Sequence, residues 1–365
     1  MKMSFDALLN GLRNFSALID GLTAKVFPRK PVDTRITVCD IGRSKTVLLE
    51  LQKNSDHLFI SRFEIIQNSF QDQKPSLVLK PWFDGKKFRR DGIRVALKGH
   101  GVVIRFIRFP KMKVEDLGSA LKYEAEQYIP FELNDVVMDF AIVEDSIKTE
   151  DGEKMEIMLA VIKRQQLDPT VEIFRNMECQ LSVVDVDVLT AMAALEYFHP
   201  EDFAGHVAIL DLGTEISSLG VVRDGKPRFI RGISYGSYDL QKRLKTRSNL
   251  SEEIIQRFFE KNVIPTPEAE QAIIESLEGL VGDLRVSFDY YYDQTPNAKP
   301  IEKLYLCGGA SQPLVLKALS EGLQMPVCGM DVMKKVKCAP EVNAEHFRMA
   351  LPLLPVALGL GVREE

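Results

Sequence analysis

The chain has 365 residues, of which 45% are hydrophobic and 27% are charged. This composition is ordinary for a globular protein, and the length allows two domains with substantial cores. A formal net charge of −5 argues against a general nucleic-acid binder, because neutralising phosphates needs concentrated lysine and arginine. The five cysteines and five histidines show no spacing typical of a metal site, so none is predicted. No stretch is long enough to cross a membrane, and no signal peptide is visible.

The first 31 residues differ from the rest of the chain. Their apolar residues recur at helical spacing and form one stripe: Phe5, Leu8, Leu9, Leu12, Phe15, Leu18, Ile19 and Leu22. This pattern predicts an amphipathic helix followed by a linker. Such a helix either lies on a membrane or a partner, or packs on its own domain, and the sequence leaves both open.

A short turn, Asp40-Ile41-Gly42, follows an apolar strand and leads through Ser44 and Lys45 into a second apolar strand. Glycine lets the backbone approach a phosphate, and the N–H groups of the turn can bond its oxygens. The carboxylate can hold a hydrated cation. The sequence therefore predicts strands over 35–51 and 57–63, with a phosphate-binding turn inside the first pair.

Residues 93–180 read as a small α+β module inserted into the first half of the chain. Its elements are expected to be strands at 93–97 and 102–109, a helix at 114–128, strands at 136–143 and 155–162, and a helix at 169–177. The segment Lys98-Gly99-His100-Gly101 between the first two strands is typical of a hairpin turn.

A second turn of the same kind, Asp211-Leu212-Gly213-Thr214, appears about 170 residues after the first. One Asp-x-Gly turn is weak evidence, because such turns are common in hairpins. Two in equivalent contexts predict a duplicated fold that closes on a nucleotide from both sides. Gly308 and Gly309 then end an apolar strand before a helix, which would let a flat nucleobase approach the backbone.

The order of these three elements resembles the actin-like ATPase superfamily. Within it, three segments are similar to the signature of the PilM family of type IV pilus assembly proteins: Arg108-Phe109-Pro110, Glu124 to Phe131, and Val136 to Phe140. The closing stretch from Pro355 to Arg363 also looks like the end of that family. The resemblance covers roughly residues 34–363.

This resemblance implies an α/β, actin-like ATPase fold with two duplicated core domains and an inserted α+β module (strand-helix-strand-strand). In chain order, the expected parts are the helix and linker at 1–31, core domain 1 at 32–92 and 181–204, the module at 93–180, core domain 2 at 205–338 with a helical cap at about 237–296, and a return to core domain 1 at 339–365.

The resemblance also implies a partner and a location. Members of the family are cytoplasmic, peripheral at the inner membrane, and bind the cytoplasmic tail of PilN, a bitopic inner-membrane protein, between the module and core domain 1. The motor ATPase and the platform protein of the pilus are further candidate partners, and self-association is left open. Tyr128, Ile129, Pro130 and Phe131, at a helix end, either pack in the core or form a peptide-binding ledge, where proline exposes backbone and phenylalanine offers an anchor; the sequence leaves both open.

Several positions depart from the ATP-binding pattern. ATP-binding relatives carry a lysine at the position of Val47, and here the nearest lysine is Lys45. Glu215 adds a negative charge to the second turn, Cys307 replaces a glycine, and Ser251–Lys261 lacks a clean adenosine motif. A site for ATP or ADP with magnesium that is weakened or lost is therefore predicted.

The nucleotide-binding candidates are Asp40, Gly42, Ser44, Lys45, Asp211, Gly213, Thr214, Gly308 and Gly309. No catalytic residue is assigned, although Asp185 and Asp187 lie at a strand-to-helix junction where a base could stand. The leading hypothesis is a non-catalytic scaffold of a type IV pilus or type II secretion platform. The alternatives are an active ATPase that couples closure to pilus assembly, and an FtsA-like polymer associated with the membrane.

Overall fold

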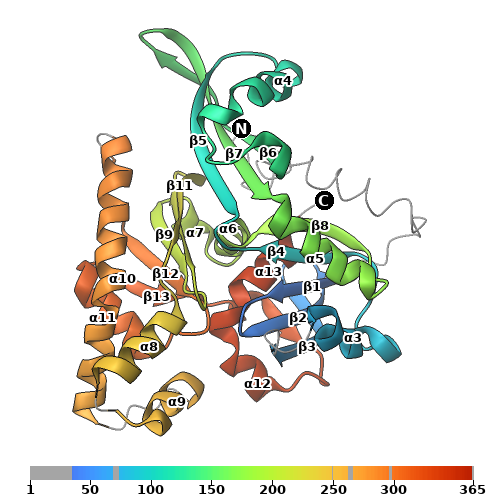
Figure 1. Cartoon of the computed structure of the whole chain (residues 1–365), viewed down its shortest axis with the longest axis vertical. Helices are drawn as coiled ribbons and strands as arrows, with labels where there is room; N and C mark the ends of the chain where they lie inside the picture. Colours follow the sequence, from blue (N-terminus) through green and yellow to red (C-terminus); the bar gives the residue numbers. More distant parts are fainter. Residues whose placement is uncertain (1–34, 69–73, 249, 262–265, 296–297, 364–365) are drawn as a thin grey trace.

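The computed structural model describes residues 35–68, 74–248, 250–261, 266–295 and 298–363 (Figure 1). The amphipathic helix predicted within residues 1–31 lies outside the described residues.

The first sheet has six strands in the order β14-β3-β2-β1-β4-β8. Its strands are β1 (Arg35–Ile41), β2 (Lys45–Lys53), β3 (Leu58–Gln67), β4 (Ile93–Leu97), β8 (Leu181–Val186) and β14 (Val336–Cys338). β1, β2 and β3 are antiparallel neighbours, whereas β4, β8 and β14 each run parallel to the strand they join. The mainly apolar residues of β2 are buried on both faces, as expected for a sheet that is covered on both sides.

The second sheet repeats this plan with five strands in the order β11-β10-β9-β12-β13. Its strands are β9 (His206–Asp211), β10 (Ser217–Arg223), β11 (Lys226–Ile233), β12 (Lys303–Cys307) and β13 (Val327–Gly329). β9 pairs antiparallel with β10 and parallel with β12, as β1 pairs with β2 and β4. The expectation of a duplicated fold is therefore confirmed at the level of strand order.

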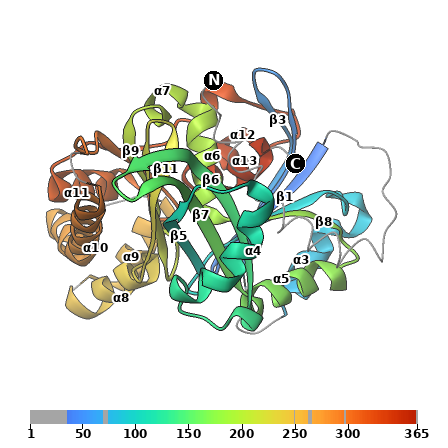
Figure 2. The ribbon, with the colours of Figure 1, turned by 90° about the horizontal axis from the view of Figure 1, so that it is seen from above.

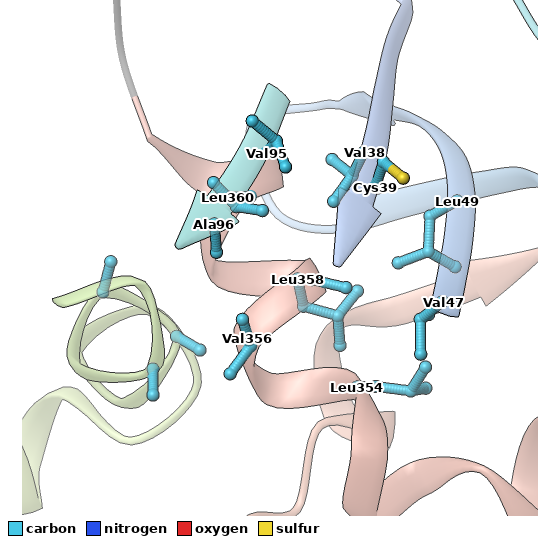
Figure 3. Close-up of a cluster of buried hydrophobic side chains, with 14 of the residues drawn as sticks. Val38, Cys39, Val47, Leu49, Val95, Ala96, Leu354, Val356, Leu358 and Leu360 are labelled. Carbon is cyan, nitrogen blue, oxygen red and sulfur yellow. The ribbon is translucent and has the colours of Figure 1, made fainter. Parts of the chain in front are cut away.

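Two helices lie between the sheets, α6 (Asp187–Phe198) and α13 (Leu354–Val362). Both are apolar around their circumference and buried, which suits a helix covered on all sides. Figure 3 shows Leu354, Val356, Leu358 and Leu360 of α13 in the same cluster as side chains of β1, β2 and β4. α13 approaches α6 so closely that a Cβ at Gly359 would lie 1.8 Å from the carbonyl oxygen of Thr190.

A third sheet, antiparallel and three-stranded in the order β5-β7-β6, lies at one end of the molecule in Figure 1, and Figure 2 looks down onto it. It consists of β5 (Val102–Pro110), β6 (Val136–Thr149) and β7 (Gly152–Lys163), and α4 (Val114–Glu124) packs on it. We call this unit the module.

The predicted hairpin at Lys98–Gly101 is wrong. β4 pairs with β1 and β8 in the first sheet, and β5 pairs with β7 in the module. The segment is therefore a crossing between sheets, and we place the start of the module at residue 102 rather than 93. The chain also returns to the first core before residue 339, because β14 pairs with β3.

The remaining helices cover the outer faces. They are α3 (Pro75–Phe83), α5 (Arg164–Asn176), α7 (Pro200–Phe203), α8 (Ser237–Arg247), α9 (Glu252–Lys261), α10 (Pro267–Gln294), α11 (Pro313–Leu323) and α12 (Ala344–Met349). α3 and α5 join the first core, and α8 to α11 pack on the second. Among the described residues, no helix is both long and apolar enough to cross a membrane.

Candidate functional site

A cleft of about 500 Å³ opens between the two core sheets, within the usual range for small-molecule sites. All nine nucleotide-binding candidates from the sequence line it: Asp40, Gly42, Ser44, Lys45, Asp211, Gly213, Thr214, Gly308 and Gly309. The fold therefore brings together residues that are up to about 270 positions apart in the chain.

Strand register places the two aspartates at equivalent points. Asp40 is near the end of β1, opposite Ala96 of the parallel strand β4, and Asp211 ends β9 opposite Cys307 of β12. Both side chains are largely buried. The predicted strand–turn–strand elements thus deliver one carboxylate from each half of the molecule to the cleft.

Lys98 joins these two carboxylates. Its Nζ lies 3.5 Å from Asp40 Oδ1 and 3.7 Å from Asp211 Oδ2. Lys98 directly follows β4. Because β4 is parallel to β1, the lysine lies at the same end of the strands as Asp40, the carboxyl end. Lys98 is not among the residues predicted from the sequence, because the hairpin pattern of Lys98–Gly101 hides it. The parallel pairing of β4 with β1 is what indicates its position.

The charges at this point perturb one another. Burial disfavours the charged form of Lys98, but the nearby carboxylates outweigh it and raise the lysine pKa above its ordinary value. Burial raises the pKa of Asp40, and Lys98 only partly offsets that effect. Burial also raises the pKa of Asp187 to about 7, although Lys98 and the hydrogen bonds from Ser218 Oγ and the Val188 N–H act to lower it. Desolvation therefore dominates at both aspartates.

The glycines of the two turns have a local explanation. A Cβ at Gly42 would lie 2.7 Å from the carbonyl oxygen of Lys45, and one at Gly213 would lie 2.3 Å from that of Ile216. Gly308 has φ +102°, and a Cβ there would lie 2.2 Å from the carbonyl oxygen of Leu212. Backbone geometry alone requires glycine at these places, so the glycines do not by themselves indicate a ligand.

The two turns also touch each other across the cleft. Ser44 Oγ and Thr214 Oγ1 lie 3.0 Å apart, and Arg43 Nε lies 3.3 Å from Glu215 Oε1. The negative charge of Glu215, which the sequence suggested would repel a phosphate, is thus paired with Arg43. The expected repulsion is correspondingly reduced.

The helical cap forms the other wall of the cleft. Tyr238 and Gln241 of α8 and Phe259 of α9 line it, together with Leu353. Aromatic and apolar side chains suit a flat base. Ser251–Lys261 carries no clean adenosine motif, and the signal for this wall is the Phe258-Phe259 pair on the amphipathic helix α9.

The residues of the cleft fit the phosphates and base of a nucleotide. Asp40 Oδ1 is buried, and no hydrogen bond from a described residue reaches it; its ion pair with Lys98 is longer than an ordinary hydrogen bond. A buried carboxylate oxygen of this kind takes a donor such as a water, because phosphate oxygens are acceptors as well. Ser44, Lys45, Lys98 and Thr214 are the side chains placed to hold phosphate oxygens. Among the described residues, no group of three or more histidine, cysteine, aspartate or glutamate side chains is arranged to hold a metal ion.

A second hollow, of about 440 Å³, lies where the module meets α5. We call it the groove; its lining residues are Pro130, Phe131, Glu132, Asp135, Lys163, Arg164 and Gln165. Of the four ledge residues from the sequence, Pro130 and Phe131 line it. Ile129 is instead buried in the core of the module and Tyr128 packs against that core, so the ledge is shifted toward its C-terminal half.

Comparison with known proteins agrees with this architecture. The sequence model of the family described as type IV pilus assembly protein PilM matches residues 39–365. A solved structure titled "PilM-PilN type IV pilus biogenesis complex" superposes with a TM-score of 0.76 at 24% identity, covering 90% of this chain and 98% of that one.

Two more distant structures also align. The ethanolamine utilization protein EutJ from Carboxydothermus hydrogenoformans gives a TM-score of 0.48 at 12% identity, covering 97% of this chain and 98% of that chain. The cytoplasmic domain of EpsL, an inner-membrane component of the type II secretion system of Vibrio cholerae, gives 0.44 at 10% identity, covering 91% and 96%. The duplicated sheets, the turns at their edges and the family match lead to one conclusion: the chain has an actin-like ATPase fold and belongs to the PilM family of type IV pilus assembly proteins.

Proposed function

We propose that this protein is a scaffold of the inner-membrane assembly platform of a type IV pilus. It binds the cytoplasmic tail of a PilN-like bitopic protein in the groove, and a nucleotide in the cleft biases how the two halves of the molecule close. The observation that carries this proposal is the groove itself, which lies between the module and the first core.

The lining of the groove suits an extended peptide. Phe131 is half-buried and offers an aromatic surface, and Lys163 Nζ lies 4.2 Å from the centroid of its ring. Glu132 and Asp135 provide acidic groups, while Lys163 and Arg164 provide basic ones. An aromatic anchor surrounded by charged groups of both signs is typical of a peptide-binding site.

The backbone next to the groove can extend the interaction. β6 is an edge strand of the module sheet, and it begins at Val136, directly after Asp135 of the groove. An extended peptide can add to such an edge by main-chain hydrogen bonds, with side-chain pockets supplying specificity. The structure titled PilM-PilN, in which a protein of this fold is complexed with PilN, supports the same partner.

Closure of the cleft can reach the groove through the module. Arg228 of β11, in the second core, pairs with Glu144 at 2.6 Å and with Glu156 at 2.8 Å in the module. Lys226 of β11 pairs with Glu144 at 2.8 Å. A movement of the second core relative to the first therefore acts on the module that forms one wall of the groove.

Titration of a labelled peptide tests the proposal. The peptide is the N-terminal cytoplasmic tail of the PilN-like protein encoded in the same genome, and binding is followed by fluorescence anisotropy. We expect saturable binding that Phe131→Ala weakens at least about tenfold, as for an aromatic hot spot.

Tyr123→Ala is the matched control, because Tyr123 is an 85% exposed aromatic of α4 in the same module and does not line the groove. Its affinity should equal that of the wild type. Absence of binding by the wild-type protein, or equal loss in both variants, would contradict the proposed function.

A further inference from the structure

Carboxylates outnumber cations at the floor of the cleft. Asp40, Asp187 and Asp211 all act electrostatically on Lys98. Asp187 is satisfied by hydrogen bonds from Ser218 Oγ and the Val188 N–H. The other two carboxylates have the lysine ammonium group between them, one from each half of the molecule.

The ammonium group occupies the space in which a cation would serve both aspartates. Magnesium binds its oxygen ligands at about 2.0–2.1 Å and usually combines one or two carboxylates with phosphate oxygens. With Nζ at 3.5 and 3.7 Å from the two carboxylates, an ion ligated by either of these oxygens would lie against a positive charge. Like charges in such a buried place repel strongly.

The lysine is held in this position by its backbone. It follows β4, which is hydrogen-bonded to β1 on one side and β8 on the other. Its carbonyl oxygen accepts a hydrogen bond from the side chain of Gln166 on α5. Its side chain is 24% exposed, so a charged ligand in the cleft can still reach the ammonium group.

We propose that the ammonium group of Lys98 takes the place of the divalent cation between Asp40 and Asp211, so that the cleft binds the phosphate groups of a nucleotide without magnesium. This inference rests on the proposed function, in which the cleft holds a nucleotide. The lysine supplies one positive charge, which offsets part of the negative charge of the two aspartates and is open to the phosphates. A lysine at position 47 of β2 is then not needed, because the charge comes from the end of β4, on the other side of β1.

Calorimetric titration with ADP tests the inference, once in excess EDTA and once in magnesium. The wild-type protein should give dissociation constants within about twofold of each other. Lys98→Met should weaken binding in EDTA by at least about tenfold, and magnesium should restore it, because the metal can then enter between the two carboxylates. Lys98→Arg keeps the charge and should behave like the wild type.

A second measurement detects the metal ion directly. Manganese with ADP is followed by electron paramagnetic resonance: the Lys98→Met variant should immobilise the ion, and the wild type should not. Lys45→Met is the matched control, because Lys45 lines the same cleft, whereas the lysine that pairs with the two aspartates is Lys98. It should weaken ADP binding equally in both buffers. Thermal melting of each variant verifies that it is folded.

Three results would overturn the inference: wild-type binding that requires magnesium, manganese immobilised by the wild type, or no ADP binding in either buffer. Peptide binding measured on the same samples distinguishes a failure of the inference about Lys98 from a failure of the proposed function. Retained peptide binding with any of these results leaves the scaffold standing and removes the role of Lys98. Lost peptide binding together with magnesium-independent ADP binding removes the scaffold function and leaves the role of Lys98 standing.

Discussion

The hydroxyl oxygens of Ser44 and Thr214 lie 3.0 Å apart, although 170 positions separate the two residues in the chain. Each follows the Asp-x-Gly turn of its own half. The contact therefore joins the two halves at the mouth of the cleft, beside the ion pair of Arg43 with Glu215.

A disulfide between these positions should lock the cleft. In the double variant Ser44→Cys with Thr214→Cys, the sulfur atoms would take the places of the two oxygens and lie close enough to form the bond. We expect mild oxidation to cross-link the two turns and to abolish ADP binding, and reduction to restore it. Peptide mapping by mass spectrometry identifies the link. Ser44→Cys alone should have the same ADP affinity before and after oxidation; a fall on oxidation there would mean that the native thiols cause the effect.

Gly359→Ala should destabilise the protein severely. Its Cβ would lie 1.8 Å from the backbone oxygen of Thr190, so α13 and α6 would have to separate. We expect a loss of about 3 kcal/mol or more in the free energy of unfolding, as for strong overpacking of a core, measured by urea denaturation. Gly282→Ala in α10 is the control, because a Cβ there meets nothing within 4 Å; it should stabilise the protein by about 0.5–1 kcal/mol. Equal effects of the two substitutions would contradict the packing described for α13.

Arg228→Met should loosen the contact between the module and the second core. The substitution leaves Glu144 and Glu156 facing each other without the guanidinium that now pairs with both. We expect a loss of about 1–2 kcal/mol in the free energy of unfolding, because these pairs are only partly exposed. Arg257→Met breaks the exposed pair with Glu253 in α9 and should cost about 0.5 kcal/mol or less.

We also expect ADP to change peptide affinity in Arg257→Met but not in Arg228→Met.

The stability that Glu144 contributes through its ion pairs with Lys226 and Arg228 should depend on pH. Burial opposes ionisation of Glu144, but hydrogen bonds from Lys226 and Arg228 outweigh it and hold its pKa below the ordinary value of 4.5. A lowered pKa in the folded state means that the stabilising effect is complete above pH 4.5 and is lost as the pH falls through the lower, folded-state value. The difference in unfolding free energy between the wild type and Glu144→Gln should therefore be constant from pH 8 to 5 and shrink in more acidic buffers. A difference that grows with acid would contradict the assigned pairs.

Much of the fold could be predicted from the sequence because its signals are local. Each Asp-x-Gly turn lies between apolar runs with strand spacing, so the hairpins containing Asp40 and Asp211 follow from residues within one short segment. The likeness of these two segments predicted the duplicated sheets. The nine cleft residues came from the same turns and from Gly308-Gly309, and all of them line one cavity.

The errors concern pairing between distant segments. The run Lys98–Gly101 contains two glycines, and a local reading cannot distinguish a hairpin from a crossing between sheets. Ile129 stands in the proposed ledge by sequence, but its side chain turns into the core of the module. ATP-binding relatives carry a lysine at the position of Val47, and the sequence alone did not show that Lys98, about 50 positions later, reaches the aspartates instead.

The sequence by itself determined the elements and the duplicated plan, because apolar periodicity and turn residues act over a few positions. It indicated the family because several short segments resemble the family signature. Only the tertiary structure decided which charges meet. Lys98 is placed beside Asp40 by the parallel pairing of β4 with β1, and beside Asp211 by the packing of two sheets around α6 and α13. Such contacts depend on register and packing across long separations, and no local pattern encodes them.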